Sequence, residues 1–234
     1  MKKLLEIKNL SKSYGDTTIL KDINLEIESG KIIGLLGRNG AGKTTLIKLI
    51  NGLLTATSGE IIVAGHPVGV KSKSLISYLP ERTYLNKNMT VRETIQFFAD
   101  FYQDFSTKKA EKLLRDLDLD QAAKLSKLSK GMLEKVQLAL VMSRKAKLYI
   151  LDEPLGGVDP ATRDYILDTI LQNFDEGASM IISTHLISDI ERILDEVIFI
   201  DNGEIKLVGS AEDLRAKHKQ SIDEIFRKEF KNVR

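Results

Sequence analysis

The chain of 234 residues contains no cysteine, which excludes a disulfide framework and thiol-based chemistry. No apolar run approaches the ~18 to 20 residues that span a bilayer, so if the protein works at a membrane, another chain must cross it. The net charge is only +2 at pH 7 and argues neither for nor against a nucleic-acid partner. The first residues, MKKLL, do not form a signal-peptide pattern, and we therefore expect a cytosolic location.

The most specific pattern in the chain is a glycine-rich run. It follows a strand-like stretch at 31–36 and precedes apolar residues at helical spacing, which is the context of a phosphate-binding loop. We call this run the phosphate loop, and its expected ATP-binding residues are Gly37, Arg38, Asn39, Gly40, Ala41, Gly42, Lys43, Thr44 and Thr45. The alternative is a glycine-rich turn that matches GxxxxGK[ST] by chance, which is expected roughly once in a hundred chains of this length.

Each residue type in the phosphate loop has a chemical reason. The three glycines allow positive φ angles and the close approach of backbone N–H groups to a phosphate, and the following helix adds its positive end. We expect Lys43 to reach the β- and γ-phosphates, Thr44 to place its hydroxyl on Mg²⁺, and Thr45 to donate to the α-phosphate. The predicted ligands are therefore ATP and Mg²⁺.

Apolar periodicity predicts an α/β fold: a P-loop NTPase core with a mostly parallel sheet and an N-terminal antiparallel β-subdomain. Residues 4–9 and 19–28 alternate apolar and polar residues, which is typical of half-buried strands. Strands at 148–151 and 180–182 alternate with a helix near 160–173, and this order indicates parallel pairing.

An all-helical subdomain is expected between the two halves of the core. Thr90 and Glu93 fit a capping box before apolar residues at near-helical spacing, which are Ile95, Phe97, Phe98 and Phe101. We expect a single domain, divided into a core (about 1–84 and 146–209), a helical insertion (about 85–145) and C-terminal helices (210–234). The last helices begin at Ser210 and Ser221, and the final one is either a dimer contact or plain packing, of which we favour packing.

A second acidic motif complements the phosphate loop. The apolar run 148–151 leads into Asp152 and Glu153. At the end of a buried strand beside the loop, Asp152 would hold Mg²⁺ through water, and Glu153 would polarise the attacking water as a general base. The alternative is an ordinary acidic exit from a strand, and the phosphate loop makes the functional interpretation the favoured one.

Four further segments complete a pattern over nearly the whole chain. They are Leu128-Ser129-Lys130-Gly131-Met132, Gly156-Gly157-Val158-Asp159-Pro160, Ser183-Thr184-His185 and Tyr14. With these segments the chain resembles the ATP-binding subunit of an ABC transporter. The first is similar to the family's signature loop, LSGGQ, and departs from it at Lys130 and Met132. The second segment is similar to the family's D-loop and carries Asp159. The third is similar to its switch histidine, and Tyr14 is similar to its adenine-stacking aromatic residue.

The resemblance implies a role for each of these residues, and each has a plainer alternative. Ser129, Lys130 and Gly131 would act on the ATP of the opposite subunit, whereas Ser129 alone is more often an ordinary helix N-cap. His185 would contact the γ-phosphate as a catalytic residue, whereas a lone histidine at a strand end is more often structural. Tyr14 would stack on adenine, whereas a single tyrosine is usually a packing residue.

The largest departure from the family pattern is Glu81, which stands where the family usually has glutamine. A carboxylate oxygen is a hard ligand that can face Mg²⁺ or the attacking water, so we keep Glu81 as both a metal and a catalytic candidate. Glu81 and the LSKGM variant resemble the exporter branch whose membrane subunits are separate chains.

The resemblance also implies partners and a mechanism. One phosphate loop per chain implies a homodimer, or a heterodimer with a similar subunit, that sandwiches ATP between Lys43 of one copy and Ser129 of the other. Hydrolysis would drive transport, with export the favoured direction, through an integral membrane permease at the cytoplasmic face of the cell membrane. The alternatives are a soluble ABC ATPase of translation or DNA repair and a nucleotide-binding regulator without turnover. We expect no nucleic-acid partner.

Overall fold

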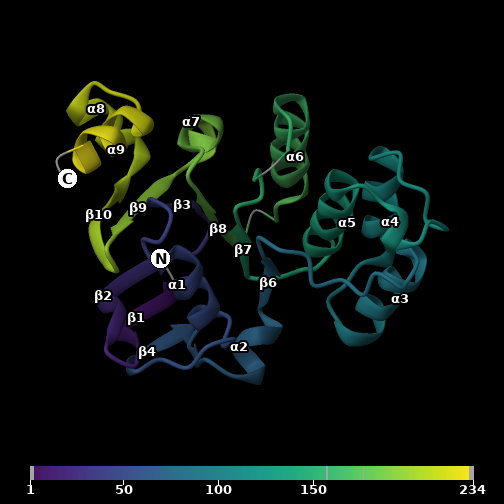
Figure 1. Ribbon diagram of the computed structural model, residues 1–234, viewed down its shortest axis with the longest axis horizontal. Helices are drawn as coiled ribbons and strands as arrows, with labels where there is room; N and C mark the ends of the chain where they lie inside the picture. Colours follow the sequence, from purple (N-terminus) through teal and green to yellow (C-terminus); the bar gives the residue numbers. More distant parts are fainter. Residues whose placement is uncertain (1–2, 157, 176, 232–234) are drawn as a thin grey trace.

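A mostly parallel sheet crosses the middle of the molecule in the computed structural model (Figure 1). The structure describes residues 3–156, 158–175 and 177–231. The strand order of this sheet is β10-β9-β3-β8-β7-β6, in which β9, β3, β8, β7 and β6 run parallel and β10 pairs antiparallel with β9. Its strands are β3 (Ile32–Leu36), β6 (Ile76–Leu79), β7 (Leu148–Asp152), β8 (Ser179–Thr184), β9 (Glu196–Asp201) and β10 (Glu204–Ser210).

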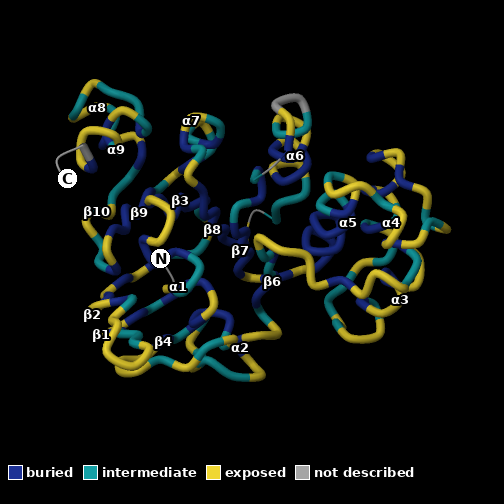
Figure 2. Tube along the Cα trace, in the orientation of Figure 1, coloured by how far each residue is buried: buried dark blue, intermediate teal, exposed yellow. Residues whose placement is uncertain are grey.

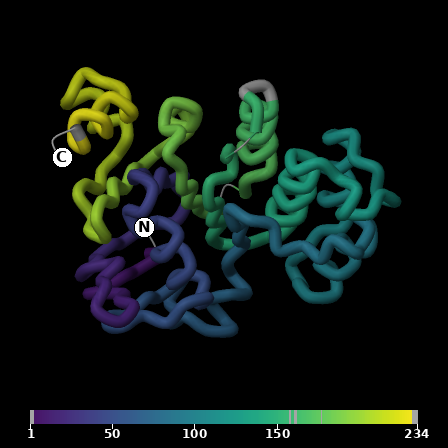
Figure 3. Tube along the Cα trace, in the orientation of Figure 1, coloured from purple at the N-terminus to yellow at the C-terminus, as the bar shows by residue number. Residues whose placement is uncertain are grey.

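The parallel sheet joins segments that lie far apart in the sequence. Figure 3 shows early and late parts of the chain side by side, and β3 pairs with both β8 and β9. Because parallel strands end at the same edge, the segments that follow β3, β6, β7 and β8 meet there. These segments are the phosphate loop, residues 80–83, Glu153 and His185.

A smaller antiparallel sheet packs against the first and has the strand order β2-β1-β4-β5. Its strands are β1 (Lys3–Tyr14), β2 (Thr17–Glu28), β4 (Ser58–Val63) and β5 (His66–Pro67). Ile23, Leu25 and Ile27 on β2 are all buried, as their alternation predicts. The predicted α/β class, with a mostly parallel sheet and an N-terminal antiparallel sheet, is confirmed.

Helices connect the strands and cover both faces of the parallel sheet (Figure 1). The helices between core strands are α1 (Lys43–Ile50), α2 (Val70–Ser74), α6 (Pro160–Asn173) and α7 (Ile187–Ile190), followed by the 3-10 turn η2 (Glu191–Ile193). Between β6 and β7 lie α3 (Val91–Phe101), α4 (Thr107–Asp116), the 3-10 turn η1 (Leu125–Lys127) and α5 (Lys130–Met142). Across the described residues, every helix is too short or too polar to cross a membrane.

Helix α3 begins where its capping box predicts, but only some of its aromatic residues are buried. The Thr90 hydroxyl accepts from the Glu93 amide at 3.2 Å, and the Thr90 amide donates to the Glu93 carboxylate at 2.7 Å. Phe98 is buried, whereas Phe97 is 56% exposed and Phe101 is 69% exposed. Residues four apart share a face, and Phe97 and Phe101 occupy the outer one. Figure 2 shows how much of this helical region faces solvent.

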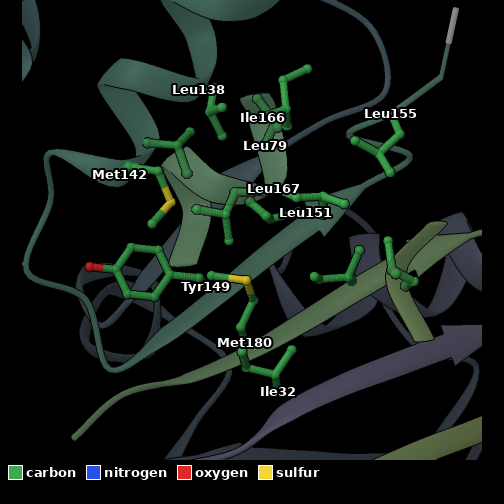
Figure 4. Packing of buried hydrophobic residues seen from close by; sticks show 14 of the residues in the cluster. Ile32, Leu79, Leu138, Met142, Tyr149, Leu151, Leu155, Ile166, Leu167 and Met180 are labelled. Carbon is green, nitrogen blue, oxygen red and sulfur yellow. The ribbon is translucent and has the colours of Figure 1, made fainter. Parts of the chain in front are cut away.

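Alternate residues of β3 face two separate apolar cores. Ile32 and Leu36 belong to the core shared with α5 and α6, whereas Ile33 and Leu35 face α1 and the antiparallel sheet. Figure 4 shows the first core, in which Tyr149, Leu151 and Met180 from the sheet meet Leu138, Met142 and Leu167 from the helices. Each fully buried aliphatic side chain of this kind contributes roughly 1.5–3 kcal/mol to stability.

The C-terminal part starts with the β9–β10 hairpin, whose turn residues Asn202 and Gly203 have φ angles of 48° and 75°. Both values are positive, which a type I′ turn requires. Helices α8 (Ala211–His218) and α9 (Ile222–Lys231) follow, and the hydroxyls of Ser210 and Ser221 cap them as predicted. The division of the chain at about residues 84, 145 and 209 stays a prediction.

Candidate functional site

A cavity of ≈ 940 Å³ lies at the edge of the parallel sheet where the strand ends meet. The phosphate loop forms one wall, and the N-terminal half of α5 forms another. The residues that line the cavity are Ile19, 38–45, 79–83, Lys130, Leu133, Glu134, Gln137, Leu138, 152–154, Gly156, Ile166 and His185. The topology therefore gathers residues from four strand ends and one helix of the insertion around one space.

Glycine is required at two positions of the phosphate loop for different structural reasons. Gly42 has a φ of +107°, and a Cβ there would lie 2.7 Å from a methyl group of Leu20. A positive φ is also expected at Gly37, and this expectation is wrong, because Gly37 is not among the glycines with a positive φ. A Cβ on Gly37 would instead lie 2.5 Å from the carbonyl oxygen of Ile200, so close approach to β9 requires glycine here.

Lys43 is the buried cation of the site and begins α1. Its side chain is 7% exposed, and Nζ donates to the carbonyl oxygen of Gly37 at 2.7 Å and of Arg38 at 3.2 Å. Nζ also lies 3.8 Å from Oε1 of Glu153. Burial lowers the pKa of Lys43, and the negative charges of Glu153, Asp152 and Glu81 act in the opposite direction.

Asp152 ends β7 as a buried carboxylate with one unpaired oxygen. Oδ1 accepts from the Ser183 hydroxyl at 2.7 Å, whereas Oδ2 has no hydrogen-bond partner among the described residues. Burial raises the pKa of Asp152, the hydroxyls of Ser183 and Thr44 counteract this, and the charges of Glu153 and Glu81 add to it.

A Mg²⁺ ion fits this donor set. Mg²⁺ usually takes one or two carboxylates, a few waters and phosphate oxygens, rather than a cage made only of protein ligands. In keeping with this, no group of three histidine or acidic residues forms a metal cluster in the part of the chain that the structure describes. The buried, unpaired Oδ2 of Asp152 is the feature that a cation would satisfy, and the Thr44 hydroxyl interacts with the same carboxyl group.

Glu153 has a strained backbone and well-defined side-chain partners. Its φ of 52° is positive, a conformation that is uncommon for residues other than glycine and that clusters at functional sites. Oε2 lies 2.9 Å from Nδ1 of His185 and accepts from the Thr184 hydroxyl at 3.3 Å. The Glu153 amide donates to the Ser183 carbonyl at 2.9 Å, which fixes the turn after β7.

Glu81 lies on the exposed segment that follows β6 and lines the same cavity. Its negative charge acts on the pKa of both Lys43 and Asp152. The structure thus brings Glu81, Asp152, Glu153, His185 and the phosphate loop together at one edge of the sheet.

Other predicted residues lie outside the cavity. Among the described residues, Tyr14, Ser129 and Gly131 are not part of its lining. Tyr14 is 50% exposed near the end of β1, with Lys12 Nζ 4.6 Å from its ring centre. Ser129 caps α5 by accepting from the Met132 amide at 3.2 Å.

The other two predicted residues also lie at the starts of helices, Lys130 as the first residue of α5 and Asp159 as the N-cap of α6. Lys130 does line the cavity and pairs with Glu134 at 3.6 Å. Asp159 accepts from the Thr162 amide at 3.1 Å at the start of α6. Gly157, between the acidic motif and Asp159, lies outside the described residues.

The sequence interpretation missed two polar cavity residues on α5. Glu134 and Gln137 line the α5 wall, and each has a buried side-chain atom without a partner among the described residues, Oε2 and Nε2 respectively. Burial raises the pKa of Glu134, and the charge of Lys130 opposes this. Their spacing of three from each other, and of four and seven from Lys130, places all three on one helix face. That spacing was the signal that was available in the sequence.

Comparison with known proteins identifies the family of this site. A family model described as ABC transporter matches residues 20–156, more than half of the chain. The chain belongs to the ABC transporter family. Within that family it carries the ATP-binding domain with a P-loop NTPase fold, as its core and phosphate loop indicate.

Relatives and a solved structure agree with this assignment. The ABC transporter chain is 34% identical over 219 residues to the linearmycin resistance ATP-binding protein LnrL of Bacillus subtilis (strain 168), covering 90% of this chain and 70% of that protein. It is 33% identical to the SkfA peptide export ATP-binding protein SkfE of the same strain, covering 86% and 87%. A solved ATP-binding subunit of an ABC transporter matches with a TM-score of 0.86 and 31% identity over 96% of this chain and 98% of that one.

Proposed function

We propose that this chain binds ATP with Mg²⁺ and hydrolyses it as the ATP-binding subunit of an exporter. The observation that carries the proposal is the meeting of Lys43, Asp152 and Glu153 at one cavity edge. These residues supply a buried cation, an unpaired buried carboxylate oxygen and an oriented second carboxylate. Phosphoryl transfer needs these parts: charge to hold phosphates, a metal ligand and a group that directs water.

We assign a role to each of these groups. Lys43 neutralises the β- and γ-phosphates, and the amides from residue 38 to Thr45 surround them. Asp152 and Thr44 would hold Mg²⁺, with Glu81 as a further candidate ligand, and the ion would supply charge neutralisation. Glu153 takes the proton of the attacking water, since His185 and Thr184 fix its side chain, which is 13% exposed. His185 orients Glu153 and contacts the γ-phosphate.

We further propose that two copies, or this chain and a similar subunit, form the active unit. The support is the position of Ser129 and Gly131, which do not line the cavity of their own chain although they lie on the same helix as residues that do. The free amides at the start of α5 and the Ser129 hydroxyl are suited to a phosphate from a second chain. Asp159 of the D-loop would lie at the same interface. Tyr14 remains our candidate for stacking on adenine, because the residue is 50% exposed.

The membrane partner is proposed to be a separate permease, with this chain at the cytoplasmic face of the membrane. The printed names of the relatives, linearmycin resistance and peptide export, favour export. The segment that follows Glu81 carries exposed aromatic residues that suit contact with such a partner. These are Tyr84, Phe97 and Phe101, and each is more than half exposed. The rings of Phe97 and Phe101 are stacked 6.3 Å apart on the outer face of α3. Clusters of exposed aromatic residues mark protein contact sites.

The test of the proposed function measures ATP hydrolysis by the purified chain alone and with membranes that contain the candidate permease. We expect Mg²⁺-dependent hydrolysis that the permease changes. Replacement of both Phe97 and Phe101 by serine should remove the permease effect and leave hydrolysis by the isolated chain. Hydrolysis that permease membranes do not alter would indicate a soluble ATPase, and ATP binding without hydrolysis would indicate a regulator.

A further inference from the structure

The C-terminal helix α9 ends against the phosphate loop, although about 190 residues separate them. Arg38, the second residue of the loop, donates from Nη2 to the carbonyl oxygen of Phe230 in the last turn of α9. The Arg38 guanidinium carbon also lies 5.8 Å from the centre of the Phe230 ring. Phe230 is only 3% exposed, so Arg38 contacts a packed part of the helix.

Strand β9 holds both α9 and the loop. On one face, Phe199 packs against Phe226 with ring centres 5.3 Å apart, and Phe226 packs against Phe230 at 4.3 Å. On the other face, the next residue of β9, Ile200, is in close contact with Gly37. Because successive residues of a strand point to opposite faces, β9 separates the helix from the loop, and the Arg38 side chain joins them directly.

The same arginine also contacts the cation of the nucleotide site. Its carbonyl oxygen accepts from Lys43 Nζ at 3.2 Å, while its guanidinium donates to Phe230. The final carbonyl groups of a helix lack partners within the helix and carry partial negative charge, so a cation there is favourable. Lys43, Arg38 and Phe230 therefore form a continuous chain of contacts from the phosphate site to α9.

We propose that α9 positions the phosphate loop through Arg38, so that ATP binding and the order of the last turn of α9 are coupled. The coupling rests on the proposed function, since it requires ATP to bind this loop. If the α9 contact favours the form of the loop that binds ATP, then ATP slows the opening of α9 by the same factor, because linkage is reciprocal. A cation at a helix end changes an equilibrium by roughly two- to five-fold, and this sets the size of the expected effect.

Amide hydrogen exchange of the full chain tests the contact itself, without nucleotide. Arg38→Met should raise exchange in the last turn of α9 by about two- to five-fold. Arg38→Lys, which keeps a cation, should restore part of the protection. Lys48→Met is the matched control, because it removes one exposed positive charge from α1 and should leave α9 unchanged. Equal exchange of α9 in Arg38→Met and in the unmodified chain would overturn the proposal.

A second arm adds Mg²⁺ and ATP at saturation, with ATP binding measured on the same samples. Bound ATP should slow exchange of the last turn of α9 in the unmodified chain and in Lys48→Met but not in Arg38→Met. Phe230→Leu, which keeps an apolar side chain but removes the ring beside the Arg38 guanidinium, should weaken ATP binding by about two- to five-fold. ATP binding with unchanged or faster exchange of α9 would overturn the coupling alone. Failure of the unmodified chain to bind ATP would overturn the proposed function together with the coupling.

Discussion

Nδ1 of His185 lies 2.9 Å from Oε2 of Glu153, and this contact joins the ends of two neighbouring parallel strands. The other carboxylate oxygen of Glu153 lies 3.8 Å from the ammonium of Lys43. The carboxylate is thus held between two basic groups on a backbone with a φ of 52°. A group fixed in this way is oriented before the reacting water arrives, which is the geometric requirement for a general base.

Replacement of His185 by alanine should lower turnover more than ATP binding. Loss of the imidazole frees Glu153, and misplacement of a catalytic group costs about 10- to 100-fold in kcat. The measurement is steady-state ATP hydrolysis together with the equilibrium Kd for ATP, which we expect to change less than kcat does. His218→Ala on α8 is the control. Unchanged kcat in His185→Ala would show that Glu153 does not depend on this contact.

Replacement of Lys43 by alanine should weaken ATP binding. A hydrogen bond to a charged group contributes about 1.5–3 kcal/mol, so we expect a rise in Kd of roughly 10- to 100-fold. Titration with a fluorescent ATP analogue provides the measurement. Lys48→Ala, an exposed lysine on the same helix, should bind as the unmodified chain does. Equal affinity of Lys43→Ala and the unmodified chain would contradict the role given to Lys43.

The effect of Mg²⁺ should depend on pH through Asp152. Burial raises the pKa of this carboxyl above its ordinary value of 3.8. At a pH between the ordinary pKa, which applies to the unfolded chain, and the raised pKa of the folded chain, the folded chain binds more protons. The free energy of unfolding without metal therefore falls as pH rises through that window. Mg²⁺ binds the carboxylate, so the stabilisation it gives in the presence of ATP should be present above the window and disappear as pH falls through it.

Thermal unfolding with ATP, with and without Mg²⁺, measures this effect across the acidic range. Asp152→Asn should remove most of the Mg²⁺ effect on Tm at every pH. A Mg²⁺ effect of the same size in Asp152→Asn would place the ion elsewhere.

Arg144 should be important for stability, because its hydrogen bonds connect the helical insertion to the core. Its side chain is 4% exposed, and it bonds to Asp104 at 3.1 Å and to the carbonyl oxygens of Ser74 and Ile76 before and in β6. Its guanidinium also lies 3.9 Å from the centre of the Tyr102 ring.

Arg144→Met leaves Asp104 and two carbonyl groups unpaired, and we expect a loss of about 2–4 kcal/mol in the free energy of unfolding. The estimate is at the lower end for a buried pair because Asp104 is partly exposed. Urea unfolding provides the measurement, and Lys145→Met at an exposed neighbouring position is the control. A change below about 0.5 kcal/mol in Arg144→Met, as for an ordinary surface substitution, would contradict this role.

Local patterns predict much of this fold. The strand alternation of Ile23, Leu25 and Ile27 and the capping box at Thr90 are each encoded within a few residues, and the structure confirms them. The gathering of the phosphate loop and the acidic motif at one edge follows from parallel pairing, which the order of strands and helices indicates.

Other features depend on contacts that one segment does not encode. Helical spacing predicts α3 but not its partner, and without the partner the exposure of Phe97 and Phe101 does not follow. The same holds for the contact between Arg38 and Phe230, since it depends on where α9 packs along β9. The positive φ of Glu153 occurs in a turn whose amide donates to the Ser183 carbonyl of another strand, and glutamate itself gives no signal for it.

The most direct test of the account is Glu153→Gln, which keeps the shape of the side chain and removes its basicity. We measure ATP turnover and, by analytical ultracentrifugation, the mass of the protein with and without Mg²⁺ and ATP. The account predicts that turnover falls by about 10²- to 10⁴-fold, that ATP still binds, and that the variant sediments as a dimer only when ATP is present. Turnover close to that of the unmodified chain, or a monomer at saturating ATP, would contradict the account.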